Sequence, residues 1–424
     1  MNIHLIQAAP VRYKEAALKG KPFQYYAPQT LNVLASSIND CSDAAITMTD
    51  QGIEPVDENI DADIVGISTT TCAAPEAYRL ARVFTNRGIS TILGGSHPTV
   101  MPDEALQHAE AVAIGPAEML WKKIISDYKK GKLHGKYSGF SHCSVIKPRY
   151  TEKRHHSYFP VDTIELTRGC SNNCSYCVIN SINNSRQYTM AYKNAVEEIK
   201  KTGRRLLFLD SNPFQNTNYF REIMRILKKE KKTWGAAATI DIADNSRFLS
   251  EIKESGCIGL LIGFESVSRE SVNSAGKYFN NTEQYIEAVK KIHDNGMGVL
   301  GTFTLGLEYD DKSIFKKTYE LVNKAKIDLA KYGILTPLPG SRIFNQYDRQ
   351  GRILTYDWSQ YDTEHVVFKP GNMNAEELMD GFRYLNRETY SYRSVFSRLF
   401  RKNKYLFIDF AANMAFKYFA KDLG

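Results

Sequence analysis

Three cysteines, Cys170, Cys174 and Cys177, follow one another within a single short segment of the chain. Thiolate sulfur is the soft ligand that iron–sulfur clusters use, and a [4Fe–4S] cube has four iron corners. Three cysteines on one loop can ligate three corners and leave the fourth iron without a protein ligand. An open metal position is where a bound molecule can react. The spacing therefore predicts a catalytic [4Fe–4S] cluster.

Two other uses of clustered cysteines fit this segment less well. A structural zinc site would need a fourth ligand nearby, and neither His155 nor His156 stands at the usual zinc-ligand spacing. A disulfide set is disfavoured because an odd triplet leaves one thiol unpaired. We expect the two isolated thiols, Cys72 and Cys257, to be ordinary buried side chains.

The pattern CxxxCxxC, with the aromatic residue Tyr176 directly before the last cysteine, resembles the motif of the radical S-adenosylmethionine (SAM) superfamily. The resemblance implies that the open iron chelates the amino and carboxylate groups of SAM and cleaves SAM reductively. It also implies that Tyr176 lies beside the bound SAM.

Composition places few other limits on the chain. Its 424 residues suffice for two domains and an extension, and its composition, 43% apolar and 24% charged, is that of an ordinary globular protein. The net charge of +8 is spread along the chain, which disfavours a nucleic-acid surface. We expect a cytoplasmic protein, because the start lacks a signal peptide and no apolar run is long enough to span a membrane.

Strand and helix patterns alternate over residues 1–125, which predicts a doubly wound, Rossmann-like parallel sheet. The expected strands are Ile3–Ala8, Ala45–Asp50, Asp63–Ser68, Ser90–Gly95 and Ala111–Gly115, with helices around Gln29–Ile38 and Glu76–Arg87. Ligands of such sheets bind beyond the carboxyl ends of the strands, which here carry small and polar residues.

This first domain resembles the cobalamin-binding domain that precedes many radical SAM domains. The resemblance rests on the strand that ends at Ser68, on Gly94-Gly95-Ser96-His97-Pro98-Thr99 and on Gly115-Pro116-Ala117-Glu118. It implies a cobalamin site at Ser68, Thr69, Gly94, Gly95, His97, Thr99 and Glu118. The DxHxxG motif, whose histidine ligates cobalt in many cobalamin proteins, is absent. We therefore expect no imidazole beneath the cobalt and interpret His97 as a hydrogen-bonding loop residue. A Rossmann-like scaffold that has lost its cofactor stays open as an alternative.

A connector is expected over residues 126–162, followed by six strand–helix units over 163–345. The expected strands are Thr163–Thr167, Arg205–Asp210, Thr233–Asp241, Ile258–Ser266, Gly298–Gly306 and Asp328–Pro337. Six units predict a partial (β/α)6 barrel of the TIM type, which is the radical SAM fold; a full barrel has eight. Residues 346–424 are expected to be mostly helical and to form a lid over the open end of the barrel.

Three further residues of the barrel resemble SAM-binding positions of the family. Asp210 ends the second strand and can accept a hydrogen bond from the SAM amino group. Glu265 in Gly263-Phe264-Glu265-Ser266 matches a glutamate beside SAM, and Phe303 lies in a segment that lines the adenine. The chain departs from the family at Ala238-Thr239-Ile240-Asp241, where relatives often carry an arginine.

The resemblance implies an enzyme that cleaves SAM at a [4Fe–4S] cluster and, with cobalamin, methylates a small organic molecule. Rearrangement or cyclisation is the runner-up reaction, and the catalytic residues beyond the cofactor sites are not identified. An electron donor such as a reductase, flavodoxin or ferredoxin is implied. A methylthiolase-like RNA-modifying enzyme and a non-catalytic cobalamin carrier are the alternatives from other classes. The aromatic and basic tail also leaves contact with a membrane surface open.

Overall fold

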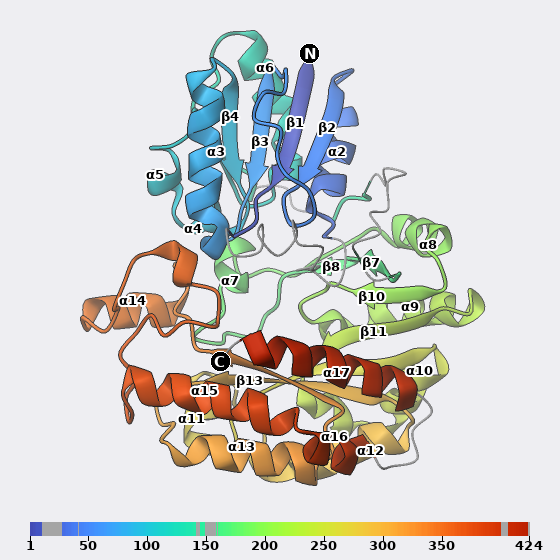
Figure 1. Cartoon of the computed structure of the whole chain (residues 1–424). Helices are drawn as coiled ribbons and strands as arrows, with labels where there is room; N and C mark the ends of the chain where they lie inside the picture. The colour runs from blue at the N-terminus through green and yellow to red at the C-terminus, as the bar shows by residue number, and fades with distance from the viewer. Residues whose placement is uncertain are drawn as a thin grey trace.

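The computed structural model describes residues 1–10, 28–40, 42–140, 145–148, 158, 160–399 and 406–422. Figure 1 shows an N-terminal α/β unit stacked on a larger barrel unit, with the C-terminal helices packed against the barrel. This is the predicted order of a Rossmann-like sheet, a partial barrel and a helical extension.

The N-terminal unit is built on a six-stranded parallel sheet whose strand order is β2-β1-β3-β4-β5-β6. Its strands are β1 (Asn2–Gln7), β2 (Ala45–Asp50), β3 (Ile64–Ser68), β4 (Ser90–Gly94), β5 (Ala111–Ile114) and β6 (Gly135–Ser138). All five predicted strands form. The sixth, β6, falls in the predicted connector, so the domain extends beyond residue 125 to at least Ser138.

Helices cover both faces of this sheet, as the doubly wound prediction requires. The helices α2 (Thr30–Asn39) and α6 (Trp121–Lys129) pack on one face, and α3 (Ala74–Asn86) packs on the other. Covered on both sides, β3 is buried along its whole length, which is why its sequence is continuously apolar. Four short elements follow the strand ends: η1 (Thr71–Ala73), α4 (Ser96–Val100), α5 (Pro102–Ala105) and η2 (Ala117–Met119).

The second unit is a six-stranded parallel sheet with the order β14-β13-β12-β11-β10-β7, which confirms the predicted partial barrel. Its strands are β7 (Asp162–Ile164), β10 (Arg205–Phe208), β11 (Thr233–Ala238), β12 (Cys257–Glu265), β13 (Gly298–Leu305) and β14 (Leu329–Ile334). Its outer helices are α8 (Tyr192–Lys201), α9 (Thr217–Lys229), α10 (Ser246–Glu254), α11 (Arg269–Ser274), α12 (Tyr285–Asp294) and α13 (Ser313–Lys324).

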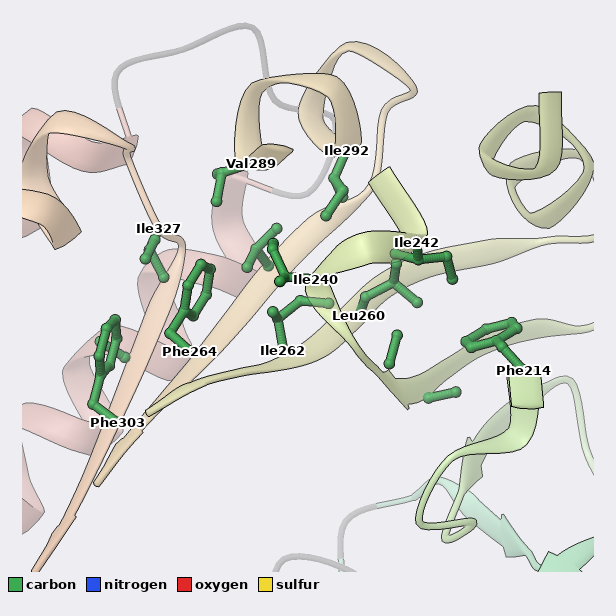
Figure 2. Packing of buried hydrophobic residues seen from close by; sticks show 14 of the residues in the cluster. Phe214, Ile240, Ile242, Leu260, Ile262, Phe264, Val289, Ile292, Phe303 and Ile327 are labelled. Atoms are coloured by element: carbon green, nitrogen blue, oxygen red, sulfur yellow. The ribbon is translucent and has the colours of Figure 1, made fainter. Parts of the chain in front are cut away.

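The main core of the barrel unit lies between its sheet and these helices. Side chains at alternate positions of each strand point outward to the helices, so β13 alternates between half-buried and buried residues along its length. Figure 2 shows the apolar side chains of this layer, among them Phe214, Leu260 and Ile292. The inward side chains of the strands are left to line the interior of the barrel.

The C-terminal extension contains α14 (Arg342–Arg349), η6 (Trp358–Gln360), α15 (Ala375–Thr389), α16 (Tyr392–Leu399) and α17 (Leu406–Asp422). Buried Arg398 donates to the carbonyls of Ile327 at 2.8 Å and Asp328 at 3.0 Å, and Asn413 donates to Asp328 O at 3.0 Å. These carbonyls directly precede β14. The helices α16 and α17 are therefore anchored at the end of the barrel where β14 begins, opposite the cysteine segment, so these two helices do not form the predicted lid.

In the described part of the chain, no helix combines the length and the apolar character needed to cross a bilayer.

Candidate functional site

The three cysteines lie on a loop held between the barrel and the extension. The loop follows the short strand β8 (Thr167–Arg168), which pairs with β9 (Tyr188–Thr189), and it leads into the helix α7 (Ile179–Ile182). The amide of Ser175 donates to Ala275 O at 2.9 Å, and its carbonyl accepts from the amide of Ile343 at 2.9 Å. These bonds fix the middle of the loop at the carboxyl end of the barrel strands.

Gly169 allows the chain to turn into this loop. Its φ is 92°, and a Cβ atom at this position would lie 2.0 Å from the carbonyl oxygen of Arg186. A side chain here would be both strained and in collision with backbone, which does not yield as a flexible side chain would. Glycine is therefore required directly before Cys170.

The cysteine thiols are free, half-buried and close enough to influence one another. Burial raises the pKa of Cys174 to about 11; the Lys277 ammonium opposes this shift, and the neighbouring Cys177, Glu265 and Cys170 add to it. Among the described residues, no three Cys, His, Asp or Glu side chains converge on a point where one metal ion could be held. Three soft thiols around one loop suit the corners of a larger cluster.

A buried ion pair lies beside the cysteine loop. Glu265 accepts a hydrogen bond from Lys277 Nζ at 2.8 Å on Oε1 and one from Thr304 Oγ1 at 2.6 Å on Oε2. The side chains of Glu265 and Lys277 are 10% and 8% exposed. Tyr176 also hydrogen-bonds to Glu265, and burial, followed by the Glu265 charge, raises the pKa of this phenol. The structure thus brings together two predicted site residues, Tyr176 and Glu265.

Lys277 was not predicted. It lies in the loop after α11, and its second hydrogen bond runs to Gly263 O at 2.9 Å. Nothing in the local sequence distinguishes it from a surface lysine. Its role depends on a contact with Glu265, which stands in a β-bulge with φ of 62°.

Asp310 hydrogen-bonds to residues that follow β12 and β13, and it was also not predicted. It is 1% exposed, and it accepts from Ser266 Oγ at 3.0 Å and from Ser271 Oγ at 2.6 Å. Its other oxygen accepts from the amides of Gly306 and Leu307. Burial raises its pKa, while these hydrogen bonds oppose the shift. Asp310 thereby fixes the loop that presents Glu265.

Asp210 is 2% exposed and lies at the end of β10 as predicted. Its carboxylate accepts hydrogen bonds from the backbone amides of Leu166, at 3.2 Å, and Thr167. Burial raises its pKa to about 7, against the opposing effect of these hydrogen bonds. In the described structure Asp210 thus holds the strand that leads into the cysteine loop, and its contact with SAM stays a prediction.

Phe303 lies on the helix-covered face of β13. Its ring is 2% exposed and stacks on Phe264 with the centroids 5.3 Å apart, on the helix-covered side of the sheet (Figure 2). Its neighbour Thr304 faces the interior and reaches Glu265. The Phe303 side chain therefore belongs to the barrel core, and the prediction that its segment lines the adenine stays a prediction. The alternation of apolar and threonine residues in β13 was the signal that could have identified Thr304.

A cavity of about 480 Å³ opens at the carboxyl edge of the N-terminal sheet, between the two units. We call it the interdomain cavity. Six of the seven residues predicted for cobalamin line it: Ser68, Thr69, Gly94, Gly95, Thr99 and Glu118. Its deeper wall is apolar and runs between the sheet and the helices α2 and α6, with Gly66, Ile92, Ala113, Val33, Leu34 and Ile124.

A partly buried ion triad closes the barrel side of this cavity. Arg168, which precedes the cysteine loop, pairs with Glu118 of the N-terminal unit and, at 2.6 Å, with Glu165 of its own unit. The side chain of Glu118 is 5% exposed. Coulomb attraction to both carboxylates outweighs desolvation, so the pKa of Arg168 is raised above its usual value. The triad links the interdomain cavity directly to the cysteine loop.

His97, the seventh predicted residue, does not line the interdomain cavity. Its ring is fully buried, with Nδ1 at 3.3 Å from Thr71 Oγ1 and Nε2 at 3.4 Å from Glu104 Oε1. Glu104 also accepts from Trp358 Nε1 of the extension at 2.8 Å. His97 thus makes the expected hydrogen bonds, but it lies in the short helix α4 and not in a loop, and its contact with cobalamin stays a prediction.

The two isolated cysteines differ in their surroundings. Cys257 is fully buried in the barrel core, and burial raises its pKa to about 12, as expected for a structural thiol. Cys72 is only half-buried and lines a second, smaller cavity. The prediction of an ordinary buried thiol is thus confirmed for Cys257 alone.

Comparison with known proteins shows what this chain is similar to. Residues 164–322, which include the cysteine loop, the last residue of β7 and the strands β10 to β13, match the model of the radical SAM superfamily. Among curated proteins, bacteriochlorophyllide d C-12(1)-methyltransferase of Chlorobaculum tepidum is 27% identical over 371 residues, covering 83% of this chain and 80% of the relative. Bacteriochlorophyllide d C-8(2)-methyltransferase of the same organism is 26% identical over 406 residues, covering 88% and 89%.

Two solved structures share the two-unit fold. The radical SAM methyltransferase TsrM from Kitasatospora setae, with tryptophan and a SAM analogue bound, superposes with a TM-score of 0.67 at 12% identity, covering 84% of this chain and 77% of that chain. The cobalamin-dependent SAM radical enzyme OxsB, with aqua-cobalamin and SAM bound, gives a TM-score of 0.67 at 12% identity, covering 99% and 71%. At these identities the likeness shows the fold alone.

Proposed function

We propose that this chain, which belongs to the radical SAM superfamily, methylates a small organic molecule with the help of a [4Fe–4S] cluster, SAM and cobalamin. The observation that carries the proposal is the meeting of two sites. The interdomain cavity and the cysteine loop share the Arg168 triad as a common wall. A cofactor in the cavity and a cluster on the loop would therefore lie side by side.

Cys170, Cys174 and Cys177 fit a [4Fe–4S] cluster by number, chemistry and position. They are free thiols on a loop fixed at the barrel's carboxyl end, where barrel active sites are found. When bound, the cluster supplies the electron that cleaves SAM. The protein holds the loop, through Gly169 and the bonds at Ser175, and excludes water from its inner side.

Glu265, Lys277, Tyr176 and Thr304 would receive SAM next to the cluster. The bound amino acid part of SAM carries an ammonium and a carboxylate, and the buried pair Glu265–Lys277 offers one charge of each sign. In the described structure the two charges pair with each other. The SAM ammonium could pair with Glu265 and the SAM carboxylate with Lys277, so that no buried charge is left without a partner. A role of Asp210 in the same subsite is part of this proposal, alongside its backbone hydrogen bonds.

The interdomain cavity fits a corrinoid with a slender nucleotide tail. Its deep wall is apolar, its mouth is polar, and Gly95, with φ of 101°, lets the loop after β4 pass close to Thr69. Its volume of about 480 Å³ is within the usual range of ligand pockets. Cobalamin would supply the carrier of the methyl group. The two ring nitrogens of His97 are already engaged, which supports the proposal that no protein imidazole ligates cobalt.

Methyl transfer is favoured over rearrangement because the relatives named above are methyltransferases. The substrate class is a small organic molecule, and the electron donor is a reductase, flavodoxin or ferredoxin. Contact of the aromatic and basic C-terminal tail with a membrane surface also remains a proposal. The cytoplasm is the proposed location.

A binding experiment tests the proposal that the interdomain cavity holds cobalamin. The cluster-loaded protein is titrated with hydroxocobalamin under anaerobic conditions, and bound corrinoid is measured after gel filtration. We expect about one corrinoid per chain. Gly94→Leu directs a bulky side chain into the cavity beside Ala113 and should abolish this binding while SAM cleavage is retained.

The form of the bound cobalt is read by electron paramagnetic resonance. A spectrum of cob(II)alamin without nitrogen superhyperfine splitting is expected. Splitting from an axial imidazole would refute the proposed cobalt environment. A protein that cleaves SAM but binds no corrinoid would instead identify the N-terminal unit as a vestigial scaffold.

A further inference from the structure

A second cavity, of about 270 Å³, lies next to the interdomain cavity and shares Thr70 and Ser96 with it. We call it the side cavity. Val178, which directly follows the last cysteine of the loop, forms part of its wall. Leu338 and Pro339, after β14, form another part. A molecule held here would lie beside both the cysteine loop and the interdomain cavity.

The polar groups that line the side cavity are mostly neutral. They include the hydroxyls of Thr70, Thr71, Ser96 and Thr363 and the thiol of Cys72. Asp362 is the single charged side chain among the described residues that line it, and lysine, arginine and histidine do not occur among them. A negatively charged ligand would find no compensating cation there, whereas a positively charged one would find a carboxylate.

Asp362 keeps acceptor capacity although its side chain is only 7% exposed. Its Oδ1 atom accepts from the amides of Glu364 at 2.9 Å and His365 at 3.2 Å, and the imidazole Nδ1 of His365 lies 3.0 Å from both oxygens. In the described structure Oδ2 has this imidazole as its one partner, while a carboxylate oxygen can accept two hydrogen bonds. His365 is itself 46% exposed and can be displaced toward solvent.

The charge of Asp362 acts across the cavity on Cys72. Burial is the main effect that raises the pKa of the Cys72 thiol, and the Asp362 carboxylate adds to it, while a hydrogen bond with Thr70 opposes the shift. The two residues come from different units of the protein, the N-terminal unit and the extension. A ligand between them would contact both.

Thr363 holds this wall in a strained conformation. Its φ is 68°, in the left-handed region, where a β-branched residue is an outlier. Its carbonyl accepts from the amide of Ile334 at 2.7 Å. Strained residues of this kind cluster at ligand sites, where the surrounding structure keeps them in place.

We propose that the side cavity is the substrate site and that it selects a substrate bearing an amino group, with Asp362 as its anionic anchor. This inference rests on the proposed function, because it takes the neighbouring cysteine loop and interdomain cavity as the places of the cofactors. The amino group would displace His365 and take its hydrogen bond to Asp362. Thr70, Ser96 and Thr363 would bind neutral polar groups of the same molecule.

Three probes of one shape and different charge test this selection: benzylamine, benzyl alcohol and benzoate. The full-length, cluster-loaded protein is treated anaerobically with iodoacetamide in the presence of each probe, and alkylation of Cys72 is measured by peptide mass spectrometry. Benzylamine should protect Cys72 at a concentration at least tenfold lower than benzyl alcohol. Benzoate should give no protection.

Two variants identify the anchor. Asp362→Asn keeps the hydrogen bonds to the backbone amides and should reduce the benzylamine preference to that of benzyl alcohol. His365→Ala removes the competing imidazole and should strengthen protection by benzylamine severalfold. Equal protection by benzoate and benzylamine, no protection by any probe, or an unchanged preference in Asp362→Asn would each overturn the proposal.

The readout separates this inference from the proposed function. Cys72 protection is measured without turnover, and SAM cleavage is measured separately in the same preparations. Loss of SAM cleavage with intact benzylamine protection would refute the proposed function alone. Intact SAM cleavage without protection would refute the substrate site alone.

Discussion

Replacing Lys277 by methionine should destabilise the protein by about 3–5 kcal/mol, the cost of leaving a buried charge without its partner. Lys277 Nζ donates to Glu265 Oε1 at 2.8 Å and to Gly263 O at 2.9 Å, and both charged side chains are about nine-tenths buried. Methionine keeps most of the length of the side chain, one heavy atom less, but removes both hydrogen bonds. Glu265 would then be left with Thr304 and Tyr176 as its partners.

A second substitution separates the charge from the packing. Glu265→Gln in the Lys277→Met background removes the unpaired carboxylate and should recover at least about 2 kcal/mol of the loss. Replacing both members of a buried ion pair by uncharged residues changes the stability little. Denaturation of wild type, both single variants and the double variant gives the coupling energy of the pair. The cluster-free protein is used, so that SAM and iron do not contribute.

The same variants have a functional readout. Glu265→Gln should weaken SAM binding to the cluster-loaded protein by about 1–3 kcal/mol, the value of a charge-assisted hydrogen bond. Calorimetric titration measures it. A loss of stability below about 1 kcal/mol in Lys277→Met, together with unchanged SAM affinity in Glu265→Gln, would refute the reasoning about this pair.

Three smaller predictions follow from single residues. The folded-state pKa of Asp210, about 7, lies above its usual 3.8, so the folded protein retains a proton that the unfolded chain releases. The free energy of unfolding therefore falls as the pH rises from about 4 to 7, by about 4 kcal/mol. Asp210→Asn should lack this fall, which melting curves at both pH values measure. Gly169→Ala should lower the iron content of the reconstituted protein by more than half, because its Cβ would lie 2.0 Å from Arg186 O. The control Gly88→Ala is also at positive φ but has open space around it, so this variant should keep its iron. Thr363→Gly should raise the free energy of unfolding by about 1 kcal/mol, because glycine relieves the left-handed strain at φ of 68°. Thr363→Ala keeps that strain and should not raise it. Thermal melting distinguishes the two variants.

Much of the fold was predictable because its signals are local. β3 is an apolar run because both of its faces are buried. β13 alternates because one of its faces is buried and the other is partly exposed. The spacing of the three cysteines and the small residues after β3 and β4 are equally local, and the latter do line the interdomain cavity. The strand β6 was missed because four residues after a helix carry little periodicity.

The rest of the site depends on contacts between distant segments. Lys277 meets Glu265 through a β-bulge, and Arg168 meets Glu118 across 50 positions of the sequence. Such pairs leave no pattern in a single sequence. Thr304 was missed for a different reason: one residue along a strand changes the face, so Thr304 and not its neighbour Phe303 reaches Glu265.

We propose that Cys170, Cys174 and Cys177 alone hold a [4Fe–4S] cluster that cleaves SAM. Iron analysis and electron paramagnetic resonance of the anaerobically reconstituted protein, before and after addition of SAM, test it most directly. We expect about four irons per chain, a reduced-cluster spectrum that changes when SAM is added, and loss of both in the variant with alanine at all three positions. Full iron content in that variant, or a cluster spectrum indifferent to SAM, would contradict it.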